Sequence, residues 1–227
     1  MTSIYERALG DSFAHLHPKI QARFGFSSAD GVAHIGTGVM DTMTRGRSIT
    51  VPFLKFGATR HLLFPEYGTN IAFTIGNYAY VDRFGRETVT WHRTFDFVLR
   101  RRWFDATMIY SDTRATIVDY LGTHQHVAAD LRCWADGKGG INFASGEQRC
   151  HEGLLNFRFP RAVTGHATVR EWFDDDIDRH RIEVAVANPL VGPVISYRGT
   201  FTDDIVAITD PTAVTVAARP TRETERA

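Results

Sequence analysis

The segment from Ile117 to Val127 holds the densest group of side chains that could do chemistry. Its sequence, IVDYLGTHQHV, places Asp119 and Tyr120 shortly before His124 and His126. Imidazole exchanges protons near neutral pH, and a nearby carboxylate or phenol can share such a proton. The segment reads as a β-strand, in which side chains alternate, so we expect both histidines on one face. The pattern predicts a polar site with these four side chains as candidate acid–base catalysts.

Two histidines at positions i and i+2 of one strand can also ligate a metal ion. Such a site needs a third ligand. His92 and His151 lie on predicted strands, and Glu147 and Glu152 could contribute carboxylates. Their spacing matches no metal-binding motif. We therefore expect no bound metal, and a His-ligated metalloprotein is kept as an alternative.

A second group of side chains predicts a cavity for a small molecule. Tyr78 and Tyr80 share one face of an expected strand with small residues, and Trp91 and Arg93 share a face of the next strand. A face that mixes aromatic and small polar groups suits a cavity with a few orienting hydrogen bonds. Together with His92, these four side chains form the predicted ligand-binding set.

The composition restricts the classes of function. The chain has 227 residues, with 26 Lys and Arg against 26 Asp and Glu, so its formal net charge is zero. A dedicated nucleic-acid binder normally carries a basic surplus, so nucleic acid is not an expected partner. Neutral proteins tend to self-associate, which leaves a homo-oligomer open. Gly36-Thr37-Gly38 lacks the flanking strand and helix of a dinucleotide-binding motif, and no nucleotide cofactor is expected.

Cysteine usage and the N-terminus suggest a cytoplasmic protein. Cys133 and Cys150 form no C-x-x-C motif, so a disulfide framework is not expected. The first residues, MTSIYER, lack the apolar run of a signal peptide. No run approaches the roughly 18 apolar residues of a membrane span. The basic run Arg100–Arg102 could still touch an anionic membrane surface.

The N-terminal region predicts short helices, and the remainder predicts strands. Ser3 and Glu6 form a capping-box pattern, and Pro18 is placed to open a further helix that stops at Gly25. From about residue 30 onward, apolar β segments follow one another with short polar turns. The segment 48–56 is expected to be an edge or bulged strand, because it contains a proline.

About ten such strands with almost no helix between them predict an antiparallel meander. A long meander must protect its edges, and closing or curling into a barrel is the usual solution. We therefore expect an all-β fold with short N-terminal helices, forming a closed or strongly curled barrel with an internal cavity. Residues 1–207 are expected to form this single domain, and residues 208–227 a flexible tail.

Several blocks of the sequence resemble a known family. They are Ser3–Gly10, His15–Pro18, Arg23–Gly25, Gly36–Met40, Gly85–Trp91 and Asp119–His126. Over about residues 3–205 the chain resembles the bacterial domain-of-unknown-function family numbered 4166, as a stand-alone member. In that family the domain often accompanies a dehydrogenase-like domain or a membrane segment. The resemblance implies one intact domain and assigns no catalytic residue.

These features favour a protein that binds a small, largely apolar molecule, such as a lipid, terpenoid or polyketide, in the barrel. If it is an enzyme, we expect acid–base isomerase, cyclase or lyase chemistry without a cofactor. The competing interpretation is a non-catalytic accessory module that docks to a membrane surface or a partner enzyme.

Overall fold

The computed structural model describes residues 2–152, 155–160, 162 and 164–208. Their helical segments are α1 (Ile4–Leu9), η1 (Gly10–His15), α2 (Pro18–Gly25), η2 (Ser28–Asp30), η3 (Ser48–Thr50) and α3 (Val51–Ala58). Their strands are β1 (Val32–Arg45), β2 (Gly68–Val81), β3 (Glu87–Phe97), β4 (Arg100–Ser111), β5 (Thr116–Leu121), β6 (Val127–Ala135), β7 (Ile141–Glu152), β8 (Leu155–Arg158), β9 (His166–Asp174), β10 (Arg179–Asn188) and β11 (Gly192–Ala207). The predicted tail lies outside these residues, apart from Ile208.

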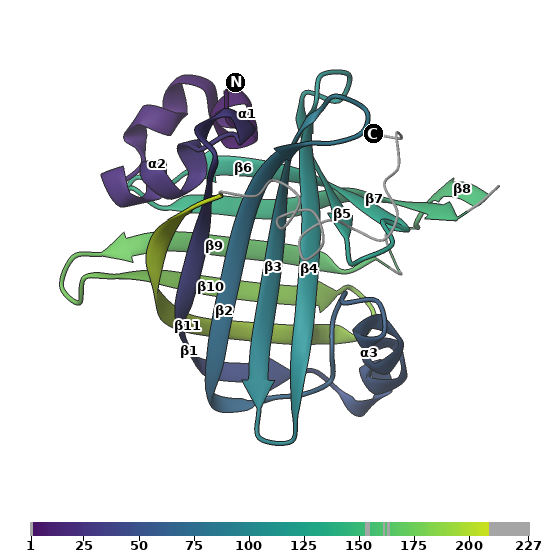
Figure 1. The fold of residues 1–227 in the computed structure, drawn as a ribbon. Helices are drawn as coiled ribbons and strands as arrows, with labels where there is room; N and C mark the ends of the chain where they lie inside the picture. The colour runs from purple at the N-terminus through teal and green to yellow at the C-terminus, as the bar shows by residue number, and fades with distance from the viewer. Residues whose placement is uncertain (1, 153–154, 161, 163, 209–227) are drawn as a thin grey trace.

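Ten of the described strands close into an antiparallel barrel (Figure 1). Consecutive strands pair from β1 to β7, then β7 pairs with β9, β9 with β10 and β10 with β11. β11 pairs back with β1, from Val32 to Arg45 of that strand. β8 pairs only with β7 and stands outside the ring. Closure removes the exposed edges of the sheet. The predicted all-β barrel is therefore confirmed.

Alternation along the strands fills the barrel with apolar side chains. On β3, Val89, Trp91, Arg93 and Phe95 are buried on the inner face, and His92 between them is half-buried on the outer face. Neighbouring strands repeat this pattern, so one core runs through the barrel. Such burial, at about 25 cal/mol per Å² of apolar surface, is the main source of stability.

The first helices cover one end of the barrel (Figure 1). The capping box of Ser3 and Glu6 is present, and Pro18 lies in the first turn of α2, as predicted. Tyr5 and Phe24 point into the core, with ring centroids 5.0 Å apart, and Phe24 also contacts Trp91 at 6.1 Å. The helices are thus fixed to the barrel by aromatic packing.

The prediction of a strand over residues 48–56 is wrong. This segment is the 3₁₀ turn η3 followed by helix α3, with Pro52 in the first helical turn, where no amide donor is needed. Thr50 and Leu54 recur at helical spacing and are buried against the barrel. For so short an apolar run, the sequence pattern does not distinguish a strand from a helix, and packing against the barrel selects the helix.

The glycines of the Gly36-Thr37-Gly38 motif serve close packing. A Cβ on Gly36 would lie 2.6 Å from Ile75 and 2.7 Å from Phe201, and one on Gly38 would lie 2.0 Å from the carbonyl oxygen of Thr200. The flanking strands β2 and β11 therefore leave no room for a side chain at Gly36 or Gly38 of β1. The glycines of this motif therefore allow the close strand packing that closes the barrel.

A buried ionic cluster lies under the N-terminal helices. Arg23 of α2 has no solvent exposure, and its Nε donates to Glu171 at 2.6 Å while its Nη1 donates to Asp203. His34 also contacts Asp203, at 2.6 Å. Burial and the Arg23 charge lower the pKa of the nearby His180 to about 4, so that imidazole is neutral at pH 7.

Replacing Arg23 should destabilise the protein strongly. Arg23→Met leaves buried carboxylates without their cation, a change that typically costs about 3–5 kcal/mol in the free energy of unfolding. Arg181→Met removes a half-exposed pair with Asp174 and should cost less than about 1 kcal/mol. Urea denaturation measures both values. Equal small losses would show that the Arg23 cluster does not hold the helices to the barrel.

Candidate functional site

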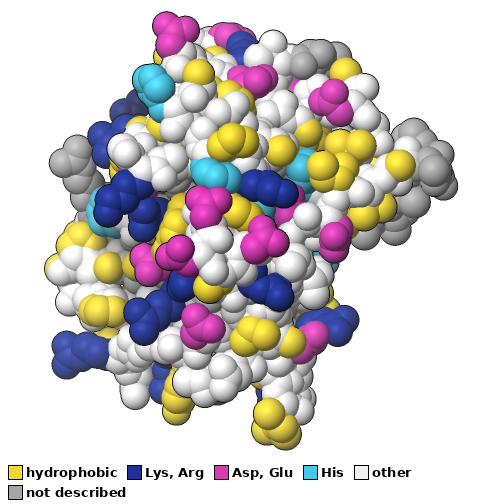
Figure 2. Space-filling model, turned by 90° about the vertical axis from the view of Figure 1, so that its left-hand side faces the viewer, with side chains coloured by type: hydrophobic (Ala, Val, Ile, Leu, Met, Phe, Trp, Pro, Cys, Tyr) yellow, Lys and Arg dark blue, Asp and Glu magenta, His cyan; other side chains and the backbone are white. Residues whose placement is uncertain are grey.

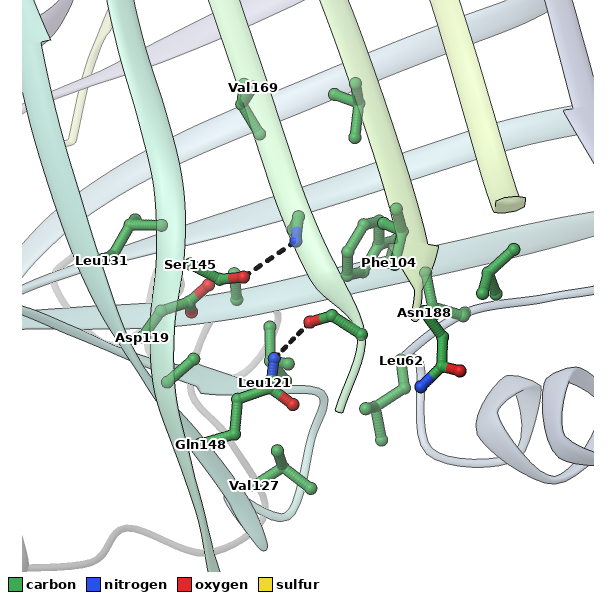
Figure 3. Close-up of a pocket in the computed structure, with 18 of the residues that line it drawn as sticks. Leu62, Phe104, Asp119, Leu121, Val127, Leu131, Ser145, Gln148, Val169 and Asn188 are labelled. Atoms are coloured by element: carbon green, nitrogen blue, oxygen red, sulfur yellow. Dashed lines mark hydrogen bonds between the residues drawn. The ribbon is translucent and has the colours of Figure 1, made fainter. Parts of the chain in front are cut away.

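The barrel contains a cavity of about 430 Å³ on the side near α3. Its wall is mostly apolar and is formed by inward-facing side chains of β3 to β7 and β9 to β11, with Leu62 and Leu63 from the segment after α3. Figure 3 shows Phe104, Leu131 and Val169 among the wall residues. The volume is within the range of about 300–1,000 Å³ that is usual for small-molecule sites.

Asp119 supplies a carboxyl group to this apolar wall. It lies on β5 with its side chain inward, opposite Ala129 of β6, and its accessible surface faces the cavity. Its Oδ1 is buried and has no hydrogen-bond partner among the described residues. Burial raises the pKa of Asp119 to about 7, although the Arg93 charge opposes this shift. The carboxyl group can therefore gain or lose a proton near neutral pH.

Arg93 brings a fixed positive charge to the cavity wall. Its Nε donates to the carbonyl oxygen of Phe104 at 3.0 Å, and its Nη1 donates to the Tyr197 hydroxyl at 3.2 Å. The guanidinium carbon also lies 3.8 Å from the centroid of the Phe104 ring. These contacts hold Arg93 in the barrel without a direct carboxylate partner among the described residues. Its charge is thus available to stabilise an anion in the cavity.

Two further polar side chains of the wall are held by the backbone of neighbouring strands. Ser145 Oγ accepts a hydrogen bond from the amide of Ala167 at 2.8 Å, and Gln148 Nε2 donates to the carbonyl of Gly165. Figure 3 shows the carboxyl group of Asp119 pointing toward the Ser145 hydroxyl. Asp119, Ser145, Gln148 and Arg93 are thus polar groups in a mostly apolar wall.

The structure does not place His124 and His126 in the cavity. Strand β5 ends at Leu121, and both histidines lie in the connection to β6, so the prediction that they share a strand face is wrong. The backbone turns at Gly122 and Gln125, which have φ values of 71° and 53°. The two rings are half-buried neighbours with centroids 5.4 Å apart, and neither lines the cavity.

The other predicted side chains divide between the two faces of the barrel. Trp91 and Arg93 line the cavity, whereas Tyr78, Tyr80 and Tyr120 do not. Alternation puts these three tyrosines on the outer face, because the apolar face of each strand fills the interior. The expectation that the mixed face of the Tyr78 segment lines the cavity is therefore wrong.

His92 belongs to a polar cluster on the outer face that the sequence did not reveal. Its Nδ1 lies 2.8 Å from Asp105 Oδ1, and His61 Nδ1 lies 2.7 Å from Asp105 Oδ2. Burial raises the pKa of Asp105, but the contacts with both histidines outweigh that effect and leave it below its usual value. His61 also stacks on Trp103 at 5.2 Å. The pairing of β3 with β4 brings His92 and Asp105 together, a register that the sequence does not specify.

Two searches of the described residues bear on the alternatives. In this part of the chain, no three His, Cys, Asp or Glu side chains are grouped as a metal site requires. None of its helices has the length and apolar character needed to cross a bilayer.

Comparison with known proteins identifies related sequences. A family model described as "Domain of unknown function (DUF4166)" matches residues 16–201. The protein described as "Uncharacterized protein YndH" from Bacillus subtilis (strain 168) is 32% identical over 204 residues, which are 90% of this chain and 98% of that protein.

The raised pKa of Asp119 predicts a pH-dependent stability. Between pH 3.8 and about 7, the native state keeps a proton that the unfolded chain loses, so this residue's contribution falls as the pH rises through that window. Asp119→Asn should remove this dependence and stabilise the protein at pH 8 by about 4 kcal/mol relative to the parent. Urea denaturation at several pH values measures the difference, with the exposed Asp178→Asn as control. Parallel curves for Asp119→Asn and the parent would contradict the raised pKa.

Proposed function

The chain belongs to the DUF4166 family, whose description assigns no activity, and from its cavity we propose that it binds a small, largely apolar molecule inside the barrel. The observation that carries the proposal is the buried carboxyl oxygen of Asp119, which has no hydrogen-bond partner in the described part of the chain and lies in a mostly apolar wall. Such a group is destabilising in an empty apolar site and is satisfied by a ligand that offers a hydrogen bond.

The cavity wall indicates the chemical class of the ligand. Because most of the wall is aliphatic or aromatic, it favours a lipid, a terpenoid or a polyketide over a sugar or a nucleotide. The polar groups require a ligand with one hydroxyl or carbonyl group near Asp119. The protonated carboxyl can donate to a carbonyl oxygen, and the ionised carboxylate can accept from a hydroxyl group.

The same geometry supports acid–base catalysis as the more specific form of the proposal. A carboxyl group with a pKa near 7 can remove a proton from a carbon beside a carbonyl group and return it at another position. Arg93 is placed in the same wall, where its charge can stabilise the oxyanion that forms. This reaction is an isomerisation. In a molecule with a second carbonyl group, attack of the enolate carbon on that carbonyl closes a ring, and the protonated Asp119 returns its proton to the resulting alkoxide. Of the four side chains that the sequence suggested as acid–base catalysts, we assign this role to Asp119, because His124, His126 and Tyr120 do not line the cavity.

Filling the cavity should abolish binding of an apolar probe. Ala129 is buried in the wall beside Asp119, so Ala129→Phe is expected to lower the affinity for N-phenyl-1-naphthylamine, measured by fluorescence titration, by about tenfold or more. Leu62→Trp, in the half-buried segment after α3, gives a second variant with less strain on the core. Both changes occupy space that the ligand needs.

The matched control is Ala185→Phe, which adds the same ring to an exposed position of β10. Circular dichroism melting confirms that each variant is folded. Unchanged probe affinity in folded Ala129→Phe and Leu62→Trp proteins would exclude the cavity as the binding site.

A further inference from the structure

Helix α3 exposes an apolar face that no described residue covers. Ile49 of η3 and Phe53 and Phe56 of α3 follow one another at i, i+4 and i+7, and their exposed fractions are 71%, 60% and 65%. On the opposite side of the helix, Leu54 is fully buried. We call the three exposed side chains the α3 face. Side chains of this size are exposed together mainly at sites of interaction.

The α3 face borders the opening of the cavity. Phe53 lines the cavity and is also exposed, and the same is true of Leu190 in the turn between β10 and β11, which is 70% exposed. Figure 1 shows α3 beside the ends of these two strands. A molecule that enters or leaves the cavity between Phe53 and Leu190 therefore passes directly beside the α3 face.

The segment that carries the α3 face is basic. Residues 45–65 contain Arg45, Arg47, Lys55 and Arg60 and no acidic residue, although the whole chain carries equal numbers of each sign. Arg47 and Lys55 are exposed. Figure 2 shows the side of the molecule turned away from α3, where cations and carboxylates are interspersed. Exposed aromatic rings and exposed cations therefore occur together in the segment that includes α3.

We propose that the α3 face docks on a lipid bilayer with anionic headgroups and brings the opening of the cavity to the membrane surface. Phenylalanine rings on a short helix insert into the interfacial region, and neighbouring cations are attracted to anionic lipids. A second copy of the chain fits this surface poorly, because two-fold pairing of α3 faces brings Arg47 and Lys55 toward their own counterparts. The docking depends on the exposed surface and is independent of the identity of any ligand.

Vesicle flotation tests the proposal. The full-length protein should float with vesicles of phosphatidylglycerol and phosphatidylcholine, and less with phosphatidylcholine alone, with binding to the former weakened by salt. Phe56→Ser and Lys55→Glu should each reduce the partition coefficient on anionic vesicles by about tenfold. Phe56 does not line the cavity, so probe binding inside the barrel should be unchanged in Phe56→Ser. This separates failure of docking from failure of the proposed ligand binding.

Two matched controls keep the result specific to α3. Ile177→Ser removes an exposed apolar side chain from the turn between β9 and β10, and Lys138→Glu reverses an exposed charge between β6 and β7. Both should bind vesicles like the parent. The proposal is overturned if the parent does not float, or if the controls lose as much binding as the α3 variants. It is also overturned if sedimentation shows a dimer that Phe56→Ser dissociates.

Discussion

Closure of the sheet between β1 and β11 is the constraint on which the rest of the structure depends. A closed barrel has no free edge, but every inward side chain leaves water. The glycines at the seam allow the strands to meet closely enough to close the ring. Once the ring is closed, any inward polar group needs a partner inside it or leaves a site for a ligand.

The two ends of the barrel meet this requirement in different ways. Under the N-terminal helices, Arg23 contacts both Glu171 and Asp203, and the cluster joins α2 to the strands. Toward α3, Asp119 lies in a mostly apolar wall that also contains Arg93 and Ser145. The Arg23 cluster thus holds helix α2 against the barrel. The Asp119 arrangement leaves a carboxyl group whose proton affinity and hydrogen-bonding capacity are available to a bound molecule, and the cavity opens beside the exposed face of α3.

The sequence predicted the barrel because strand alternation and short polar turns are local signals. The capping box of Ser3 and Glu6 and the helix start at Pro18 were predictable for the same reason. Asp119 and Arg93 were recognised as candidates, but Ser145 in the same wall was not, since the inward direction of β5 depends on the register across the barrel. His124 and His126 looked like strand residues, yet the left-handed backbone at Gly122 and Gln125 removes them from the strand. Asp105 and His61 meet only through tertiary pairing, and helix α3 is selected by packing that no local pattern encodes.

The state of the Asp119 carboxyl group is the most direct test of this account. The carboxyl carbon of Asp119, observed by ¹³C NMR as the pH is varied, reports the pKa of that side chain in the folded protein. The account predicts a midpoint at about pH 7 that moves when an apolar probe fills the cavity. A midpoint near the ordinary aspartate value, about 4, with no response to the probe, would contradict it.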